Sequence, residues 1–153
     1  MTHKELIARA GRWLLNSRRC EVVLYEPISW TAGEIPDAIG WHTGLGIVVE
    51  CKTCLSDFYA DRRKPWRKGR GLGRERWYLA EPNLAVRAKA IVQPPWGILA
   101  CHPKQVRVVV KPSPVSDACW NGRGECDILV KRAVVDLRGE VMGKVQLERQ
   151  EKP

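Results

Sequence analysis

The chain has 153 residues, with 26 Lys and Arg against 17 Asp and Glu, a formal net charge of +9 and an isoelectric point near 9.5. A 44% apolar and 28% charged composition excludes a disordered chain, and the length fits one domain over 1–153. No apolar run could span a bilayer and no signal-peptide pattern is present, so we expect a cytoplasmic protein without a membrane partner. The excess of positive charge favours a polyanionic partner, above all nucleic acid.

Periodicity and turn residues predict helices and strands that alternate along the chain. Thr2 and Glu5 form a capping box ahead of apolar residues at helical spacing, and Thr43-Gly44 suits a tight hairpin turn. Ser56 is the expected N-cap of the second helix. The predicted elements are, in order, a helix over 2–16, a strand over 20–30 interrupted at Pro27, a hairpin of 35–41 with 46–52, a helix over 55–64, a strand over 76–82, a helix over 83–92, strands over 96–103 and 105–112, and a helix over 125–141.

Two stretches fall outside this regular pattern. A basic, glycine-rich and mobile loop is expected at about 65–76, and the tail over 146–153 is expected to be frayed. The interleaved helices and strands, with an early hairpin, predict an α/β fold in which helices flank a central mixed β-sheet.

The hairpin places charged residues in apolar surroundings. Whether its loop has two or four residues, the numbers of paired positions sum to 87, so Asp37 lies opposite Glu50. Side chains at such positions have Cβ atoms ~5 Å apart. Alternation along the strand puts Glu50 and Lys52 on one face. Two carboxylates that close repel each other unless a proton or a cation compensates them.

A divalent metal ion is the natural cation for this pair, because Mg²⁺ prefers oxygen ligands. The backbone carbonyl of Cys51 could supply a further ligand, and Lys52 could hold or deprotonate a water molecule on the metal. The alternative is that Pro36-Asp37 marks a turn and Glu50 with Lys52 forms a solvated pair on a strand. The facing register and apolar surroundings favour the catalytic interpretation.

These residues resemble the signature of the PD-(D/E)XK nuclease superfamily: Pro36-Asp37, then Glu50-Cys51-Lys52 after a short hairpin. The segment "CLSDFYADRRKPW" over 54–66 resembles MmcB-like DNA-repair nucleases, and "RWYLAEP" is similar to the strand that follows in that group. The resemblance covers roughly residues 34–110. Within it, the sequence departs from the MmcB-like pattern after Trp66, where a Gly/Arg/Lys insertion appears.

The resemblance implies a restriction-endonuclease-like core and a metal-dependent endonuclease that cleaves DNA to leave 5′-phosphate ends. Asp37 and Glu50 would hold Mg²⁺ or Mn²⁺, and Lys52 would serve the water. Glu5 is the candidate for an assisting glutamate, beside its role in the capping box. Glu34 is a second possible helper, but strand alternation would put its side chain on the same face as Pro36 and on the opposite face from Asp37. The implied setting is DNA repair or recombination in a bacterial or phage-encoded protein. Relatives that resolve junctions are homodimers, so a homodimer is the oligomeric state to test.

The stretch after the candidate metal strand carries eight cations and one acid, which predicts a grip on DNA phosphates. Glycines there allow close approach of the backbone to a phosphate chain, and Trp66 and Trp77 could stack on unpaired bases. The alternative is a solvated, flexible loop. The cations are Arg62, Arg63, Lys64, Arg67, Lys68, Arg70, Arg74 and Arg76.

Other residues carry weaker signals. Asp57 and Asp61 lie four apart on one helix face, and local pairing with Arg62, Arg63 or Lys64 is the simpler role for them. The three histidines show no ligand spacing, and the tryptophans at 13, 30, 41, 96 and 120 are expected in or beside the core. The six cysteines are expected as free thiols.

Two competing functions follow from the same sequence. One is a DNA-binding module without catalytic activity, built on a nuclease fold. The other is a zinc or redox protein built on Cys51 and Cys54, although Cys119 and Cys126 lack the short spacing of zinc ligands.

Overall fold

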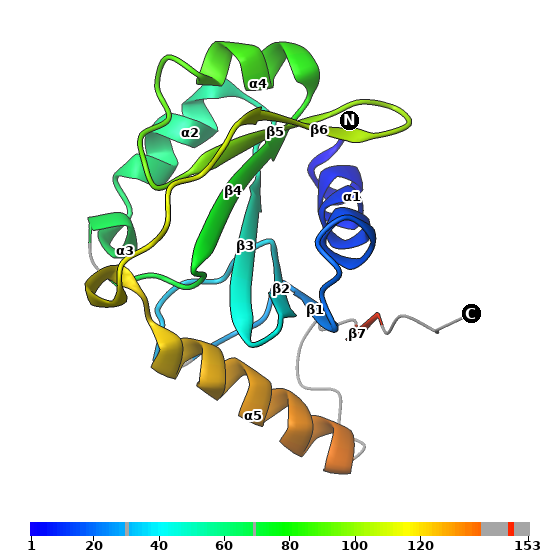
Figure 1. The fold of residues 1–153 in the computed structure, drawn as a ribbon, viewed down its shortest axis with the longest axis vertical. Helices are drawn as coiled ribbons and strands as arrows, with labels where there is room; N and C mark the ends of the chain where they lie inside the picture. Colours follow the sequence, from blue (N-terminus) through cyan, green and yellow to red (C-terminus); the bar gives the residue numbers. More distant parts are fainter. Residues whose placement is uncertain (30, 69, 139–146, 149–153) are drawn as a thin grey trace.

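The computed structural model describes residues 1–29, 31–68, 70–138, 147 and 148 (Figure 1). The helices are α1 (His3–Asn16), α2 (Leu55–Arg62), α3 (Pro65–Lys68), α4 (Pro82–Ala88) and α5 (Gly122–Arg138), with a 3₁₀ turn at Asp117–Cys119. The strands are β1 (Val22–Tyr25), β2 (Ala38–His42), β3 (Leu45–Cys51), β4 (Glu75–Ala80), β5 (Gly97–Cys101), β6 (Val106–Val110) and β7 (Leu147–Glu148).

The strands form one mixed sheet in the order β6-β5-β4-β3-β2-β1-β7. The pairs β3–β4 and β4–β5 are parallel, and all other pairs are antiparallel. This confirms the predicted α/β fold with a central mixed sheet flanked by helices. In the part of the chain that the structure describes, no helix has the length and apolar character needed to cross a membrane.

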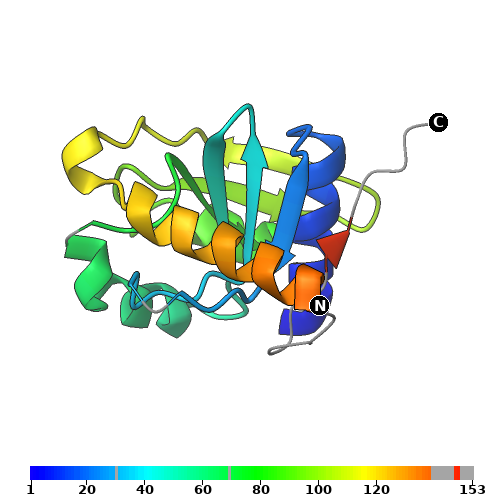
Figure 2. The ribbon, with the colours of Figure 1, turned by 90° about the horizontal axis from the view of Figure 1, so that it is seen from below.

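The sheet separates two apolar layers. Figures 1 and 2 show the sheet and the helices beside it from two directions. On one face, α1 buries the expected stripe of Leu6, Ala10 and Leu14 against alternate strand residues such as Val49. The other face is covered by α2 and α4 at one end and by α5 at the other, through residues such as Ile128. Both faces are therefore buried, which explains the almost unbroken apolar runs of the parallel strands.

The hairpin of β2 and β3 has the predicted register. Its strands pair from Ala38–Val49 to His42–Leu45, so the numbers of each pair sum to 87. Thr43 and Gly44 connect them with φ of 49° and 81°. Two successive residues with positive φ form the turn whose twist matches that of the flanking strands, and Gly44 adopts this conformation without steric cost.

Three features differ from the prediction. The expected loop at 65–76 contains α3, and Leu72 within it is fully buried. Helix α2 begins at Leu55 as predicted, but its N-cap is Cys54 rather than Ser56, and the Asp57 carboxylate accepts hydrogen bonds from the backbone N–H groups of Thr53 and Cys54. Helix α5 begins before Glu125, where the Asn121 side chain accepts from the backbone N–H of Gly124.

Two predictions fall wholly or partly outside the described residues. The last part of the helix predicted over 125–141 and the residue Trp30 are not described. Within the tail predicted to be frayed, Leu147 and Glu148 form β7 and pair with β1 in antiparallel register.

One buried carboxylate fixes α5 to the sheet. Glu125 accepts hydrogen bonds from the indole N–H groups of Trp41 and Trp120, at 2.9 and 2.7 Å, and from the backbone N–H of Gly73 at 2.8 Å. It packs against Gly46 so closely that a Cβ at that position would collide with the carboxylate. Glu125 thereby joins the hairpin, the segment before β4 and α5 in one contact.

We predict that Glu125→Ala lowers the free energy of unfolding by about 3 kcal/mol or more, because three donors lose their buried acceptor. Urea denaturation followed by circular dichroism measures this. The matched control is Glu26→Ala, which removes an exposed glutamate and should change stability by about 0.5 kcal/mol at most. Equal stability of the two variants would contradict the anchoring role of Glu125.

Candidate active site

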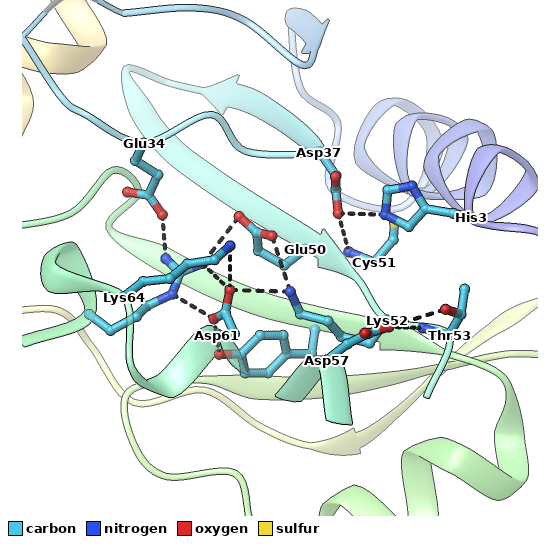
Figure 3. A network of polar contacts seen from close by, with 12 residues as sticks. His3, Glu34, Asp37, Glu50, Cys51, Lys52, Thr53, Asp57, Asp61 and Lys64 are labelled. Carbon is cyan, nitrogen blue, oxygen red and sulfur yellow. Dashed lines mark hydrogen bonds and ion pairs between the residues drawn. The ribbon is translucent and has the colours of Figure 1, made fainter. Parts of the chain in front are cut away.

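The predicted site residues lie at the carboxyl end of β3, where β3 and β4 run parallel (Figure 3). Asp37 immediately precedes β2, Glu50 is the penultimate residue of β3, and Lys52 follows that strand. Ligand sites in α/β sheets commonly lie at the carboxyl ends of parallel strands. The topology therefore places these three residues where this class of fold builds its sites.

Glu50 and Lys52 share a face of the sheet, as the alternation of the strand predicts. Lys52 Nζ lies 3.4 Å from Glu50 Oε2, and the two side chains are only 7% and 4% exposed. The backbone N–H of Lys52 donates to the carbonyl of Leu79, which fixes the end of β3 against β4. The pair is buried, so the alternative of a solvated surface pair does not describe it.

Asp37 occupies the same end of the sheet but turns to other partners. Its Oδ2 accepts a hydrogen bond of 2.6 Å from the backbone N–H of Cys51 and lies 3.3 Å from His3 Nε2. Figure 3 shows its carboxylate directed toward His3, while the Glu50 carboxylate is directed toward Lys52. No ligand spacing marks His3 in the sequence, because α1 brings it to Asp37 from 34 residues away.

Asp61 joins the site from α2, beyond the local pairing that the sequence predicts. It does pair with Lys64, at 2.9 Å. It also lies 3.2 Å from Lys52 Nζ, accepts a 2.6 Å hydrogen bond from the hydroxyl of Tyr78, and accepts a 2.6 Å hydrogen bond from Arg67 Nε. Asp61 therefore links the catalytic lysine candidate to two further residues that sequence reasoning did not place here.

Arg67 was predicted to contact DNA, and this is wrong. Its side chain is only 6% exposed and forms ion pairs with Glu34, Glu50 and Asp61. Its guanidinium also lies 4.3 Å from the ring centroid of Trp96. Helix α3 turns the side chain inward, so Arg67 acts as an internal counter-ion for three carboxylates.

Glu34 lies inside the network, which corrects its assignment to the opposite face. It is 1% exposed, binds Arg67, and accepts a 2.9 Å hydrogen bond from the backbone N–H of Leu72. The described residues of 26–37 do not form a strand, so their side chains need not alternate between two faces.

Two other residues assigned to DNA are also structural. Arg76 is 3% exposed and donates to the backbone carbonyls of Gly71, Leu72, Gly73 and Cys119, so it holds the preceding turn together. Trp77 is 3% exposed and packs in the core against the edge of Trp13, with ring centroids 5.5 Å apart. Neither side chain is available to phosphates or bases.

The remaining predicted DNA contacts are at least partly accessible. Arg62, Arg63 and Arg70 are exposed, Lys64 is 39% exposed, and Trp66 is half-buried beneath the Lys64 ammonium. Arg74 is 29% exposed, with Asp117 and the Trp120 ring as partners. The side chain of Lys68 lies outside the described residues. The accessible cations therefore centre on the C-terminal end of α2.

Burial and charge set the protonation of the network. Burial raises the pKa of Glu50 to about 7, although Arg67 and Lys52 oppose this effect. Burial alone would lower the pKa of Lys52, but Glu50 and Asp61 outweigh it and raise that pKa. Burial likewise opposes ionisation of Asp61, yet hydrogen bonds and charge from Arg67 hold its pKa well below the ordinary value. Lys52 is thus a stable cation beside a carboxylate that titrates near neutral pH.

The carboxylates of Asp37 and Glu50 have the ligand chemistry that a magnesium ion prefers, and they are directed to different partners. Glu50 Oε1 is buried and accepts no hydrogen bond, although Arg67 Nη2 lies 3.2 Å away. Among the described residues, no group of three or more His, Cys, Asp or Glu side chains is arranged around a metal position. Mg²⁺ commonly takes only one or two carboxylates from a protein and keeps several waters or substrate oxygens, so Asp37, Glu50 and the Cys51 carbonyl stay the predicted ligands.

Glu5, the other candidate ligand, has the role of a helix cap. Its carboxylate accepts from the backbone N–H of Thr2 at 2.7 Å, and the Thr2 hydroxyl accepts from the backbone N–H of Glu5. The assisting role in metal binding stays a prediction for this residue.

The cysteines do not converge. All six are free thiols. Cys51 is buried in the apolar layer beneath α1, whereas Cys54 is exposed at the start of α2 with its sulfur 2.8 Å from the Ser56 hydroxyl. The two thiols of the Cys-x-x-Cys sequence therefore point into different environments.

Neither a protein-family model nor a curated protein matches this sequence. Among solved structures, the fold is similar to that of a protein of unknown function from Silicibacter pomeroyi, with a TM-score of 0.59, 20% identity, and coverage of 94% of this chain and 97% of that one. At this identity the likeness shows the α/β fold alone. The resemblance of Pro36-Asp37 and Glu50-Cys51-Lys52 to the PD-(D/E)XK nucleases stays a prediction.

We predict that Glu50 makes the protein less stable as the pH rises from 4.5 to 7. In this window the unfolded chain releases the Glu50 proton while the folded protein retains it, so the wild type loses up to about 3 kcal/mol of stability through this group. Asp61 does not mask the effect, because its lowered pKa acts at more acidic pH.

Denaturation of the wild type and Glu50→Gln at pH 5 and pH 7, without divalent metal, measures this difference. The variant should lack the loss, whereas Glu26→Gln, at an exposed position, should keep it. The same pH slope in the wild type and Glu50→Gln would contradict the assignment.

Proposed function

We propose that this protein is a metal-dependent endonuclease that hydrolyses DNA phosphodiester bonds. The observation that carries the proposal is the buried Glu50–Lys52 pair beside Asp37 at the carboxyl end of β3. Buried charges are costly to retain, and clusters of buried charges with shifted pKa values are common at functional sites, so this cluster at one strand end favours a chemical role.

Asp37 and Glu50 would hold the ion, with the Cys51 carbonyl as a further donor. When bound, Mg²⁺ supplies charge neutralisation at the phosphate and activation of a water molecule. The water releases a proton to solvent and its oxygen forms a new bond to phosphorus as the bond to the 3′ oxygen breaks. The 3′ oxygen takes a proton from solvent, which leaves a 5′-phosphate and a 3′-hydroxyl.

Lys52 acts in this reaction as a charged hydrogen-bond donor. Glu50 and Asp61 both lie within 3.4 Å of its ammonium and raise its pKa, so it is a poor base at neutral pH. It can position the water and stabilise negative charge that develops on the phosphoryl oxygens. Asp61 orients Lys52 and is itself fixed by the Tyr78 hydroxyl, which makes Asp61 and Tyr78 positioning residues.

One observation favours the second candidate, a DNA-binding module without catalytic activity. The three carboxylates of Glu34, Glu50 and Asp61 already meet three cations, Lys52, Lys64 and Arg67. The network is therefore charge-balanced without a metal ion. A metal that binds Glu50 has to compete with Arg67, and the two candidates differ in whether it succeeds.

Repair or recombination of structured DNA in the cytoplasm of a bacterium, or during phage infection, is the setting that we propose. A homodimer would place two such sites on one DNA molecule, one for each strand.

We predict that the protein cuts plasmid or branched DNA with Mg²⁺ or Mn²⁺ and not with EDTA. Asp37→Asn, Glu50→Gln and Lys52→Met should each reduce the cleavage rate by about 10²–10⁴-fold, because each removes a metal ligand or a transition-state donor. The matched control is Asp57→Asn, which changes an α2 carboxylate whose partners are Thr53 and Cys54. Cleavage that persists in EDTA or in Asp37→Asn would refute the proposed mechanism, and metal-independent binding without cleavage would establish the binding module.

We also predict that the accessible arginines at the C-terminal end of α2, Arg62 and Arg63, carry DNA affinity. Replacement of Arg62 and Arg63 by Ala should weaken binding to duplexes of any sequence and reduce the slope of log K against log salt by about 1 per lost phosphate contact. Fluorescence anisotropy over a salt series measures both. Arg12→Ala, an exposed arginine of α1, is the control. An equal effect of the control would show a diffuse charge effect and no binding surface on α2.

A further inference from the structure

A pocket of about 180 Å³ adjoins the polar network on its α2 side. It lies between α2 and residues 91–96, the segment that connects α4 to β5. Figure 1 shows α2 and α4 side by side over this end of the sheet. Arg67 and Tyr78 belong both to the pocket wall and to the network around Asp61. Whatever occupies this pocket therefore lies next to the proposed catalytic centre.

Three aromatic rings build the inner wall of the pocket. Tyr78 stacks on Trp96 with ring centroids 4.3 Å apart and an interplanar angle of 21°, and Phe58 meets Tyr78 edge-on at 5.1 Å. The hydroxyl of Tyr78 is held by Asp61, and Trp96 is covered by the Arg67 guanidinium. The inner wall is thus aromatic, and these contacts hold its rings in place without a ligand.

The outer wall is apolar with a polar rim. Val92 and the Pro94-Pro95 pair face the rings from the connecting segment. Gln93 and Arg62 are exposed lining residues, so an amide and a cation stand at the opening. The amide can both donate and accept hydrogen bonds, and the guanidinium suits a phosphate.

We propose that this pocket receives one unpaired nucleobase, whose phosphate is bound by Arg62. The inference rests on the proposed function and names its substrate class: DNA with an unpaired or everted nucleotide. The pocket volume of about 180 Å³ is smaller than the ~300 Å³ at which pockets for drug-sized ligands begin. The pocket can therefore hold one small planar group but not a base pair. Aromatic and apolar walls with a polar edge are how enzymes hold a base outside the stack. The surrounding positive charge favours a nucleotide over a neutral apolar ligand.

Nucleotide binding tests the pocket without reference to cleavage. Calorimetry with the four deoxynucleoside 5′-monophosphates, and with deoxyribose 5-phosphate as the control that lacks a base, should show at least 10-fold tighter binding of one or more nucleotides. Val92→Trp, which fills the pocket, should abolish that difference. Val86→Trp is the matched control, because Val86 is 60% exposed on α4 and does not line the pocket. Equal binding of nucleotide and sugar phosphate would overturn the proposal.

A second measurement uses the wild type alone and so does not depend on a variant that folds. In a ¹H–¹⁵N spectrum, the indole resonance of Trp96 should shift on addition of the nucleotide, while that of Trp13, on the opposite face of the sheet, should not. An unchanged Trp96 resonance at saturating nucleotide would refute the pocket.

Cleavage assays separate this inference from the nuclease proposal. The wild type should cut a duplex with one unpaired nucleotide at least 10-fold faster than the fully paired duplex. Val92→Trp should cut the two duplexes at equal rates. Equal rates in the wild type would reject the base pocket and leave the nuclease intact. Nucleotide binding at Trp96 without cleavage of any DNA would reject the nuclease and support the pocket.

Discussion

The buried ion network around Asp61 and Arg67 is the interaction on which this end of the molecule depends. Asp61 has no exposed side-chain surface, and its partners lie just after β3, in β4, between α2 and α3, and in α3. Removal of one member of such a network leaves an unpaired buried charge, which typically costs 3–5 kcal/mol. The network therefore specifies how α2 and α3 sit on the sheet, in addition to any chemistry that it supports.

The same network explains why a short basic segment can be ordered. Helix α3 has only four residues and contributes little apolar surface, so it cannot be stable alone. It is held because Arg67 reaches Glu34 and Glu50, while the turn after it is closed by Arg76 and filled by Leu72. The basic residues that the sequence predicts in a solvated loop thus fall into two groups. Arg67 and Arg76 point inward and hold the segment to the sheet, whereas Arg62 and Arg63 stay accessible at the end of α2.

How much could be predicted depended on the range of the interaction. The register of the hairpin and the shared face of Glu50 and Lys52 followed from local rules, because turn geometry and strand alternation act over a few residues. The inward turn of Arg67 and the approach of His3 to Asp37 did not follow, since both are set by how distant elements pack. The face of Glu34 was predicted wrongly for a related reason: side chains alternate between two faces only where a strand exists.

The tight fit between Gly46 and Glu125 has an evolutionary consequence. A strand position that tolerates no Cβ, and a helix carboxylate that fills the resulting space, form a single steric unit across 79 residues of sequence. In homologues that keep this arrangement, the two positions should change together: a larger residue at 46 should accompany a shorter one at 125. Pairwise covariation between them would then report the docking of α5 on the hairpin even where overall sequence identity has faded.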